Sequence, residues 1–153
     1  MDEFDDEAVV MEQLNVFCKM CKPGTVIKRT KNKFNEKDAL VFFNKKLSAI
    51  IECKRRYRVY DSWILEVPKV MHWIEQYPDL DFIYLNRCPL GDFYLNVKKL
   101  KLKKHIKNGT LASLDGSNGV KYMLGSRLDR GWNSDQDREW LLISNDLFKK
   151  VKS

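Results

Sequence analysis

The chain has 153 residues and a formal net charge of +7, a size typical of one domain that buries about two-thirds of its unfolded surface. Its first residues are acidic and no apolar run is as long as a membrane span, so we expect neither a membrane helix nor a secretory or transit signal. Only two of the four cysteines, Cys18 and Cys21, are close together. This usage favours reduced thiols in the cytoplasm, with a metal or redox role for that pair as the alternative.

The charge is unevenly distributed along the chain. Acidic residues crowd into the first dozen positions, whereas lysine and arginine dominate the next two-thirds. A positive field of this kind attracts polyanions, of which nucleic acid is the commonest in a cell. A solvated, solubilising surface is the alternative, and charge alone favours neither.

Hydrophobic spacing of three and four predicts a helix over residues 4–20, which Pro23 and Gly24 end. Glu7 shares the apolar face of this helix, whereas Glu12 falls on the opposite side. An acid on the face expected to be buried indicates that Glu7 has a specific role.

A β-hairpin is predicted near the middle of the first half. A short β-branched strand, 25–30, and a polar loop, 31–37, precede it. Strand-like runs 38–43 and 47–54 then flank the polar turn 44–46. Within these runs, residues 39–43 and 47–51 are apolar on both faces, which is typical of central, buried strands.

Helical spacing continues over residues 62–77, where Pro68 is tolerated only if the regular helix begins near it. Two further strands, 80–86 and 93–97, flank a proline and a glycine and predict a second hairpin. The lysine-rich run 98–107 is suited to a charge-protected edge strand and also to a track that contacts phosphates.

A Gly-, Ser- and Asn-rich insertion is expected at about 105–136, with only 120–124 resembling a strand. A strand at 139–143 and a short terminal helix at 145–151, capped by Asn145, complete the elements. The order predicts a single mixed α/β domain in which helices flank one central sheet. Its core spans about 4–100 and 137–151.

The hairpin carries the strongest indication of chemistry. A turn centred on Lys45 places Asp38 directly opposite Glu52, with roughly 5 Å between their Cβ atoms. Lys54 shares their face by alternation. Two such carboxylates repel unless a cation lies between them, and Mg²⁺ or Mn²⁺ prefers this ligand type. The Cys53 carbonyl is a further candidate ligand, and the Lys54 ammonium is suited to hold the attacking water. The alternative is an ordinary cross-strand salt bridge on a solvated face.

Asp38 followed by the segment Ala49-Ile50-Ile51-Glu52-Cys53-Lys54 resembles the PD-(D/E)XK nuclease superfamily. The resemblance covers about residues 7–97 and lacks the family's proline, since Lys37 precedes the first acid. It implies a three-layer α/β/α, restriction-endonuclease-like core with a central mixed sheet, and Mg²⁺-dependent phosphodiester hydrolysis. It also implies assisting roles for Glu7 and Lys69.

Basic and aromatic residues follow the second strand of the hairpin, where they are placed to grip phosphates and stack on bases: Arg55, Arg56, Tyr57, Arg58 and Tyr60. Arg127 and Arg130 in the insertion are candidates for a flexible arm that orders on nucleic acid. A solvated strand end and a plain disordered insertion are the respective alternatives.

These observations predict a metal-dependent DNA endonuclease of homing, phage or junction type, with Mg²⁺ or Mn²⁺ as cofactor. Double-stranded or branched DNA is the expected partner, and a homo-oligomer is expected by analogy. Two alternatives stay open. One is a non-catalytic nucleic-acid-binding module with a degenerate nuclease fold. The other is an interaction protein whose acidic first residues engage a basic partner or cover its own basic cleft.

Overall fold

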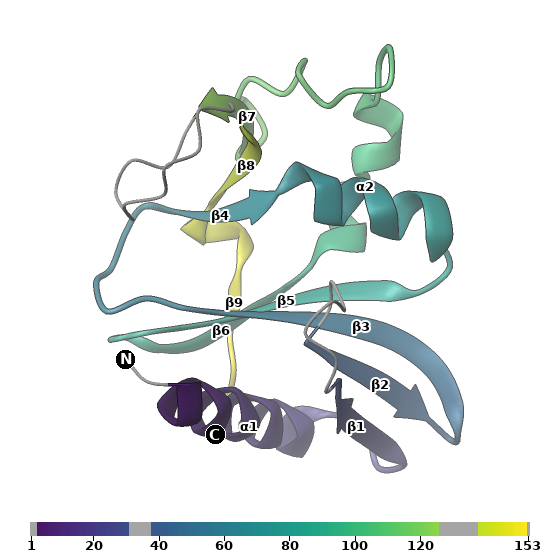
Figure 1. Ribbon diagram of the computed structural model, residues 1–153, viewed down its shortest axis with the longest axis vertical. Helices are drawn as coiled ribbons and strands as arrows, with labels where there is room; N and C mark the ends of the chain where they lie inside the picture. Colours follow the sequence, from purple (N-terminus) through teal and green to yellow (C-terminus); the bar gives the residue numbers. More distant parts are fainter. Residues whose placement is uncertain (1–2, 31–37, 126–137, 153) are drawn as a thin grey trace. The chain divides into compact units, whose positions relative to one another are not determined.

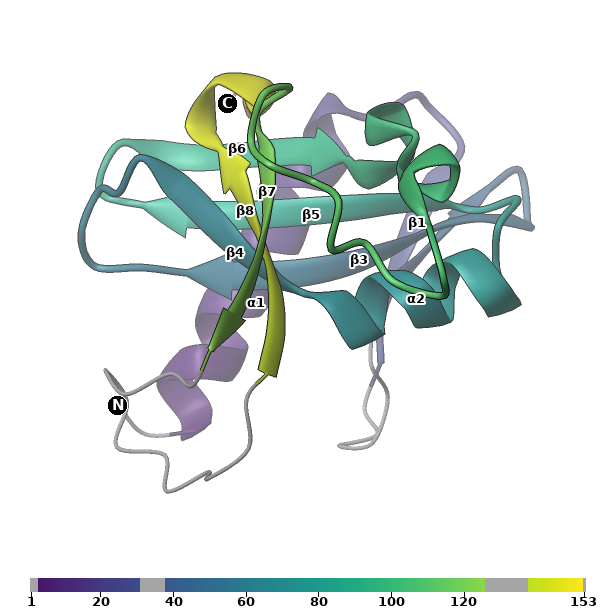
Figure 2. The same ribbon diagram turned by 90° about the horizontal axis from the view of Figure 1, so that it is seen from above.

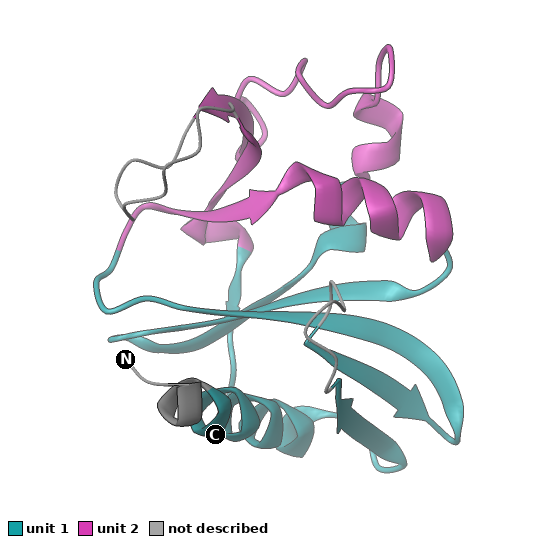
Figure 3. Cartoon of the chain, viewed as in Figure 1, with its two compact units in different colours: residues 1–59, 79–100, 148–153 teal, residues 60–78, 101–147 magenta. Residues whose placement is uncertain are grey.

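The chain divides into two compact units in the structure, a computed structural model that describes residues 3–30, 38–125 and 138–152, with side chains from residue 7 onward. The first unit comprises 1–59, 79–100 and 148–153, and the second comprises 60–78 and 101–147 (Figure 3). The expected single-domain boundaries stay a prediction. No helix in the described part is long and apolar enough to span a membrane.

The first unit is a six-stranded sheet with the helix α1 (Glu3–Met20) packed against one face (Figure 1). The strands, in sheet order, are β1 (Thr25–Arg29), β2 (Ala39–Phe43), β3 (Lys46–Arg55), β5 (Asp81–Cys88), β6 (Gly91–Asn96) and β9 (Lys149–Lys150). β3 and β5 lie side by side and parallel (Figure 2), whereas the other neighbours are antiparallel. The expected mixed α/β class with a central mixed sheet is confirmed.

One apolar cluster holds α1 to the sheet. Its buried members are Leu14, Phe17, Ala39, Val41, Ala49, Ile51, Ile83, Leu85 and Val151. The β3 residues in this cluster have odd numbers, and Cys53 packs against it as well. Because side chains alternate along a strand, the even-numbered residues of β3 project from the opposite face of the sheet.

The β2–β3 hairpin has the expected pairing over its open end, where Ala39 faces Ile51 and Val41 faces Ala49. A bulge after Val41 shifts the remaining pairs by one residue, so that a two-residue turn, Asn44-Lys45, closes the hairpin. Both turn residues have positive φ, 49° and 69°. This is the sign pattern of a type I′ turn, which matches the twist of paired strands.

Lys45→Gly is expected to raise the free energy of unfolding by about 0.5–1 kcal/mol. The left-handed conformation is unfavourable for a lysine, whereas glycine adopts it freely. Urea unfolding measures the change. Lys46→Gly, one position on in the exposed start of β3, is the matched control and should destabilise the chain. A loss of stability in Lys45→Gly would contradict the assigned turn.

The second unit contains its own three-stranded sheet, which corrects the expectation of one central sheet. Its order is β4 (Ser62–Glu66), β8 (Arg138–Ser144) and β7 (Val120–Gly125). The expected strands at 120–124 and 139–143 are therefore present. Within the Gly- and Ser-rich segment before β7, Leu111 and Leu114 are buried.

The helix expected at 62–77 is confirmed only from α2 (Val67–Gln76) onward. Pro68 lies in its first turn, where the missing amide hydrogen costs nothing. The preceding residues form β4 instead, with Trp63 and Leu65 buried at alternate positions. The predicted start of the helix was wrong because the apolar residues of 62–66 fit both helical and alternating spacing.

Two other sequence predictions are wrong. The lysine-rich run is not an edge strand but contains the 3₁₀ turns η1 (Val97–Leu100) and η2 (Leu102–His105), each anchored by one buried apolar residue. The expected terminal helix is the turn η4 (Asn145–Leu147) followed by β9, which pairs with β6. Asn145 does not cap a helix, since its side-chain amide donates to the Tyr60 carbonyl.

Candidate active site

The candidate site lies at the end of β3, where charged side chains follow a buried apolar run. Ile50 and Ile51 are 6% and 0% exposed, and the carboxylate-bearing Glu52 is only 8% exposed. Glu52 and Lys54 project from the face opposite α1, by the alternation that places Cys53 against the apolar cluster. The expected central, buried strand is confirmed. A carboxylate so little exposed requires a compensating partner or a function.

Asp38 lies one residue before β2, at the open end of the hairpin. Its backbone amide donates to the Ile51 carbonyl at 2.8 Å, and its Oδ2 accepts a hydrogen bond from the Cys53 amide at 2.8 Å. The aspartate thus leaves the regular ladder, and its carboxylate faces the main chain between Glu52 and Lys54. In the structure the Asp38 carboxylate binds the Cys53 amide, whereas the sequence predicted that Asp38 lies directly opposite Glu52.

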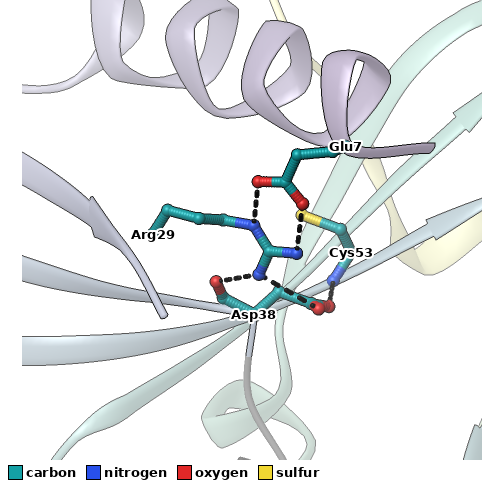
Figure 4. Close-up of polar contacts among 4 residues, drawn as sticks. All are labelled: Glu7, Arg29, Asp38 and Cys53. Atoms are coloured by element: carbon teal, nitrogen blue, oxygen red, sulfur yellow. Dashed lines mark hydrogen bonds and ion pairs between the residues drawn. The ribbon is translucent and has the colours of Figure 1, made fainter. Parts of the chain in front are cut away.

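Arg29 joins Asp38 to α1, and sequence analysis missed this residue. Its Nε and one terminal nitrogen bind both carboxylate oxygens of Glu7, at 3.1 and 3.0 Å (Figure 4). Its other terminal nitrogen donates to the Asp38 backbone carbonyl and lies 3.5 Å from the Asp38 carboxylate. Arg29 therefore holds two of the predicted site acids from opposite sides.

Glu7 does not occupy the buried face that its spacing predicted. Its side chain is 52% exposed and reaches Arg29, while Gln13, at 1% exposure, is the buried polar residue of the helix. Glu7 has a specific partner at the surface, because the fork of Arg29 matches its two carboxylate oxygens. Its assisting role in catalysis stays a prediction.

Charged groups surround the Cys53 position: its amide binds the Asp38 carboxylate, and Glu52 precedes it in β3. Burial raises the pKa of the Cys53 thiol well above its ordinary value, and the negative charges of Asp38 and Glu52 raise it further, against the opposing charge of Arg29. Burial alone would lower the pKa of Arg29, but its bond to Glu7 and the charge of Asp38 give a net increase. The two carboxylates thus act on one point at the strand end.

The raised Cys53 pKa predicts a pH dependence of stability. Between the thiol's unfolded and folded pKa values only the folded chain holds the proton, so stability falls as pH rises, by about 1.4 kcal/mol per pH unit. Cys53→Ala removes this contribution. Urea unfolding at pH 7.5 and 9.5 should show a smaller loss for the variant than for the native chain, and equal losses would contradict the assignment.

The side chains at this strand end provide only some of the ligands that a hard divalent cation needs. Carboxylates of Asp38 and Glu52 are the ligands that Mg²⁺ and Mn²⁺ prefer. Among the described residues no group of three or more His, Cys, Asp or Glu side chains is arranged to hold a metal. A cation at this strand end therefore needs water and a backbone oxygen, such as the Cys53 carbonyl, to complete its shell. Glu7 is a poor candidate, because both its oxygens already bind Arg29.

Lys69 lies in the second unit, on α2, where its ammonium is 4.0 Å from Glu66. Its predicted part in catalysis stays a prediction. The site is therefore built here from first-unit residues alone.

Basic and aromatic residues continue beyond Lys54. The Arg55 guanidinium lies 5.4 Å from the centre of the Tyr57 ring, and Tyr57 is 69% exposed. The Arg56 amide donates to the Arg87 carbonyl at 2.9 Å, which extends the pairing of β3 with β5. Arg58 and Tyr60 are exposed. Arg127 and Arg130 lie outside the described residues.

Arg29→Met is expected to lower the free energy of unfolding by about 1–2 kcal/mol, because charge-assisted hydrogen bonds to Glu7 and Asp38 are lost. Solvent limits the loss, because Glu7 is half exposed and its charge is screened by water. Urea unfolding measures it, and high salt should reduce it. Lys28→Met, which removes an exposed charge lying 5.2 Å from the Phe42 ring, is the control. Equal effects would mean that the Arg29 contacts do not stabilise the fold.

Comparisons with known proteins add little. No protein-family model and no curated protein matches the chain. Among solved structures, it is similar to Hjc, a Holliday junction resolvase from Archaeoglobus fulgidus, with 11% identity over 95% of each chain and a TM-score of 0.44. A likeness at this level carries no argument about the activity of the present chain.

Proposed function

We propose that this chain is a metal-dependent DNA endonuclease that hydrolyses phosphodiester bonds at the end of β3. The observation that carries the proposal is the 8% exposed Glu52 beside a Cys53 amide that binds Asp38 at 2.8 Å. Two carboxylates at one strand end, followed by a lysine on the same face as Glu52, form a set suited to phosphoryl chemistry.

In this proposal Asp38 and Glu52 hold Mg²⁺ or Mn²⁺, which when bound activates water and offsets phosphate charge. Lys54 orients the attacking water and stabilises negative charge that develops on the phosphate. The Cys53 amide fixes one oxygen of the Asp38 carboxylate, and Arg29 holds the main chain of Asp38 through its carbonyl. These contacts reduce the reorganisation needed when substrate binds.

Substrate binding is assigned to the basic and aromatic residues after β3. Arginines contact the phosphate backbone, and exposed aromatic rings such as Tyr57 stack on bases near the cutting centre. The net charge of +7 predicts that affinity falls steeply with salt. Double-stranded or branched DNA is the proposed substrate, and a homodimer, by analogy with enzymes that cut two strands, is the proposed assembly.

The proposal is tested with native chain and Asp38→Ala on supercoiled plasmid, four-way branched DNA and single-stranded RNA, each with Mg²⁺. Native chain should cut a DNA substrate, and Asp38→Ala should not. Asp61→Ala, an exposed acid of the second unit, is the matched control and should cut as the native chain does. Full activity in Asp38→Ala would remove the metal role assigned to this carboxylate.

A second candidate is a non-catalytic nucleic-acid-binding module. The observation in its favour is Arg29, which already neutralises Glu7 and lies 3.5 Å from the Asp38 carboxylate. This reading predicts DNA binding that is unchanged by EDTA and no cleavage with any metal. Electrophoretic mobility shifts with and without Mg²⁺ distinguish it from the first candidate.

A further inference from the structure

A buried amide without a hydrogen-bond partner lies beside the candidate site. Asn86 on β5 is 0% exposed, and neither its side-chain nitrogen nor its oxygen has a partner among the described residues. Burying an amide in this way forfeits its hydrogen bonds to water, and nearly all buried polar groups in native proteins are satisfied. An exception of this kind points to a ligand or a bound water.

The position of Asn86 connects it to Lys54. β3 and β5 are parallel, and Lys54 is the register partner of Asn86, two positions beyond the Glu52–Tyr84 pair. Ile83 and Leu85 belong to the cluster under α1, so Asn86 projects from the opposite face, as Glu52 and Lys54 do. Neighbouring strands are about 4.8 Å apart, which is within reach of one bridging water.

The other face of the same strand ends is polar as well. Gln13 on α1 is 1% exposed, and its amide nitrogen lies 3.4 Å from the carbonyls of both Lys54 and Leu85. Its own side-chain oxygen has no partner among the described residues. Polar groups on both faces thus mark the carboxyl ends of the two parallel strands, which is where α/β sheets bind ligands.

We propose that Asn86 is a positioning residue of the Lys54 site, and that its amide holds a buried water which orients the lysine side chain. The inference rests on the proposed nuclease function, because it assigns Lys54 the catalytic contact. Asn86 does not touch substrate, since its side chain is fully buried. It acts through the water, and its loss should lower kcat with little change in KM.

Asn86→Leu separates this role from a purely structural one. Leucine has similar size and no polar atoms, so replacing an amide that has no protein partner among the described residues should leave the melting temperature equal or higher. The proposal predicts that kcat nevertheless falls by about 10- to 100-fold, as when a supporting hydrogen-bond partner of an active site is lost. Asn86→Ser, which keeps a polar atom and leaves room for water, should restore most of the turnover.

The second measurement is a high-resolution crystal structure of the native chain. A water should lie about 2.7–3.2 Å from the Asn86 amide. An Asn86→Leu variant that melts higher and cuts like the native chain overturns the inference, and so does a dry amide bonded only to protein. If the leucine variant does not fold, the turnover of Asn86→Ser and the presence of water at Asn86 in the native crystal structure test the inference. If the native chain cuts nothing, the proposed function fails, and hydration alone decides whether Asn86 binds water.

Discussion

Lys54→Ala is expected to lower the rate of DNA cleavage by about 10²- to 10³-fold, the usual effect of removing one group that stabilises transition-state charge. The backbone conformation at residue 54 should be unchanged in the variant, because the carbonyl of this residue accepts a hydrogen bond from Gln13 and its strand pairs with β5. Substrate affinity should change little, since many other lysines and arginines carry the +7 charge.

The matched control is Lys46→Ala, at the exposed beginning of the same strand. Both variants lose one positive charge from β3, so a general electrostatic effect on DNA binding would appear equally in both. Single-turnover cleavage with excess protein measures the chemical step apart from binding. Equal rates for the two variants would show that Lys54 has no special role.

Glu52→Gln is expected to abolish detectable cleavage and to weaken Mn²⁺ binding by at least about 10-fold, because a neutral amide is a poor ligand for a hard cation. The substitution keeps the size of a side chain that is 8% exposed, so the fold should remain. Isothermal titration with Mn²⁺ measures the affinity, and circular dichroism checks the secondary structure.

Glu12→Gln is the control for this second prediction. Glu12 is on α1, is 66% exposed and forms an ion pair with Arg87 at 3.1 Å, so its loss should leave Mn²⁺ affinity unchanged. Unaltered Mn²⁺ binding in Glu52→Gln would assign the metal to other residues. Loss of binding with cleavage retained would remove the metal from the mechanism.

The hairpin and its central strand could be predicted because the information is local. Apolar residues on both faces of 47–51 require burial on both sides, and alternation then assigns Lys54 a face. The bulge after Val41 could not be read from composition, yet it restored the predicted pairing at the open end.

Arg29 could not be predicted because its contacts depend on three separate elements. Pairing of β1 with β2 places Arg29 opposite Ala39, beside the start of the hairpin, and only the packing of α1 brings Glu7 within reach. Sequence spacing measures none of these distances. The available signal was Arg29 itself, a basic residue at the end of a β-branched strand. Such residues are common at strand ends where they bind no specific partner.

The C-terminal segment shows a different limit of sequence reasoning. Residues 145–151 have helix-like spacing, but Val151 is 6% exposed in the cluster under α1 and Lys149 pairs with Tyr94 of β6. Long-range pairing outweighed a weak local preference. Asn86 is a similar case, because a polar residue at a strand end looks ordinary until its burial is known.

Cleavage of supercoiled plasmid by the native chain and by Lys54→Ala, with Mg²⁺, Mn²⁺, Ca²⁺ or EDTA, tests the central claim most directly. The account predicts nicked or linear DNA with Mg²⁺ or Mn²⁺ from the native chain, and intact plasmid with EDTA or with Lys54→Ala. Plasmid that the native chain binds in EDTA but never cuts with any metal would contradict it.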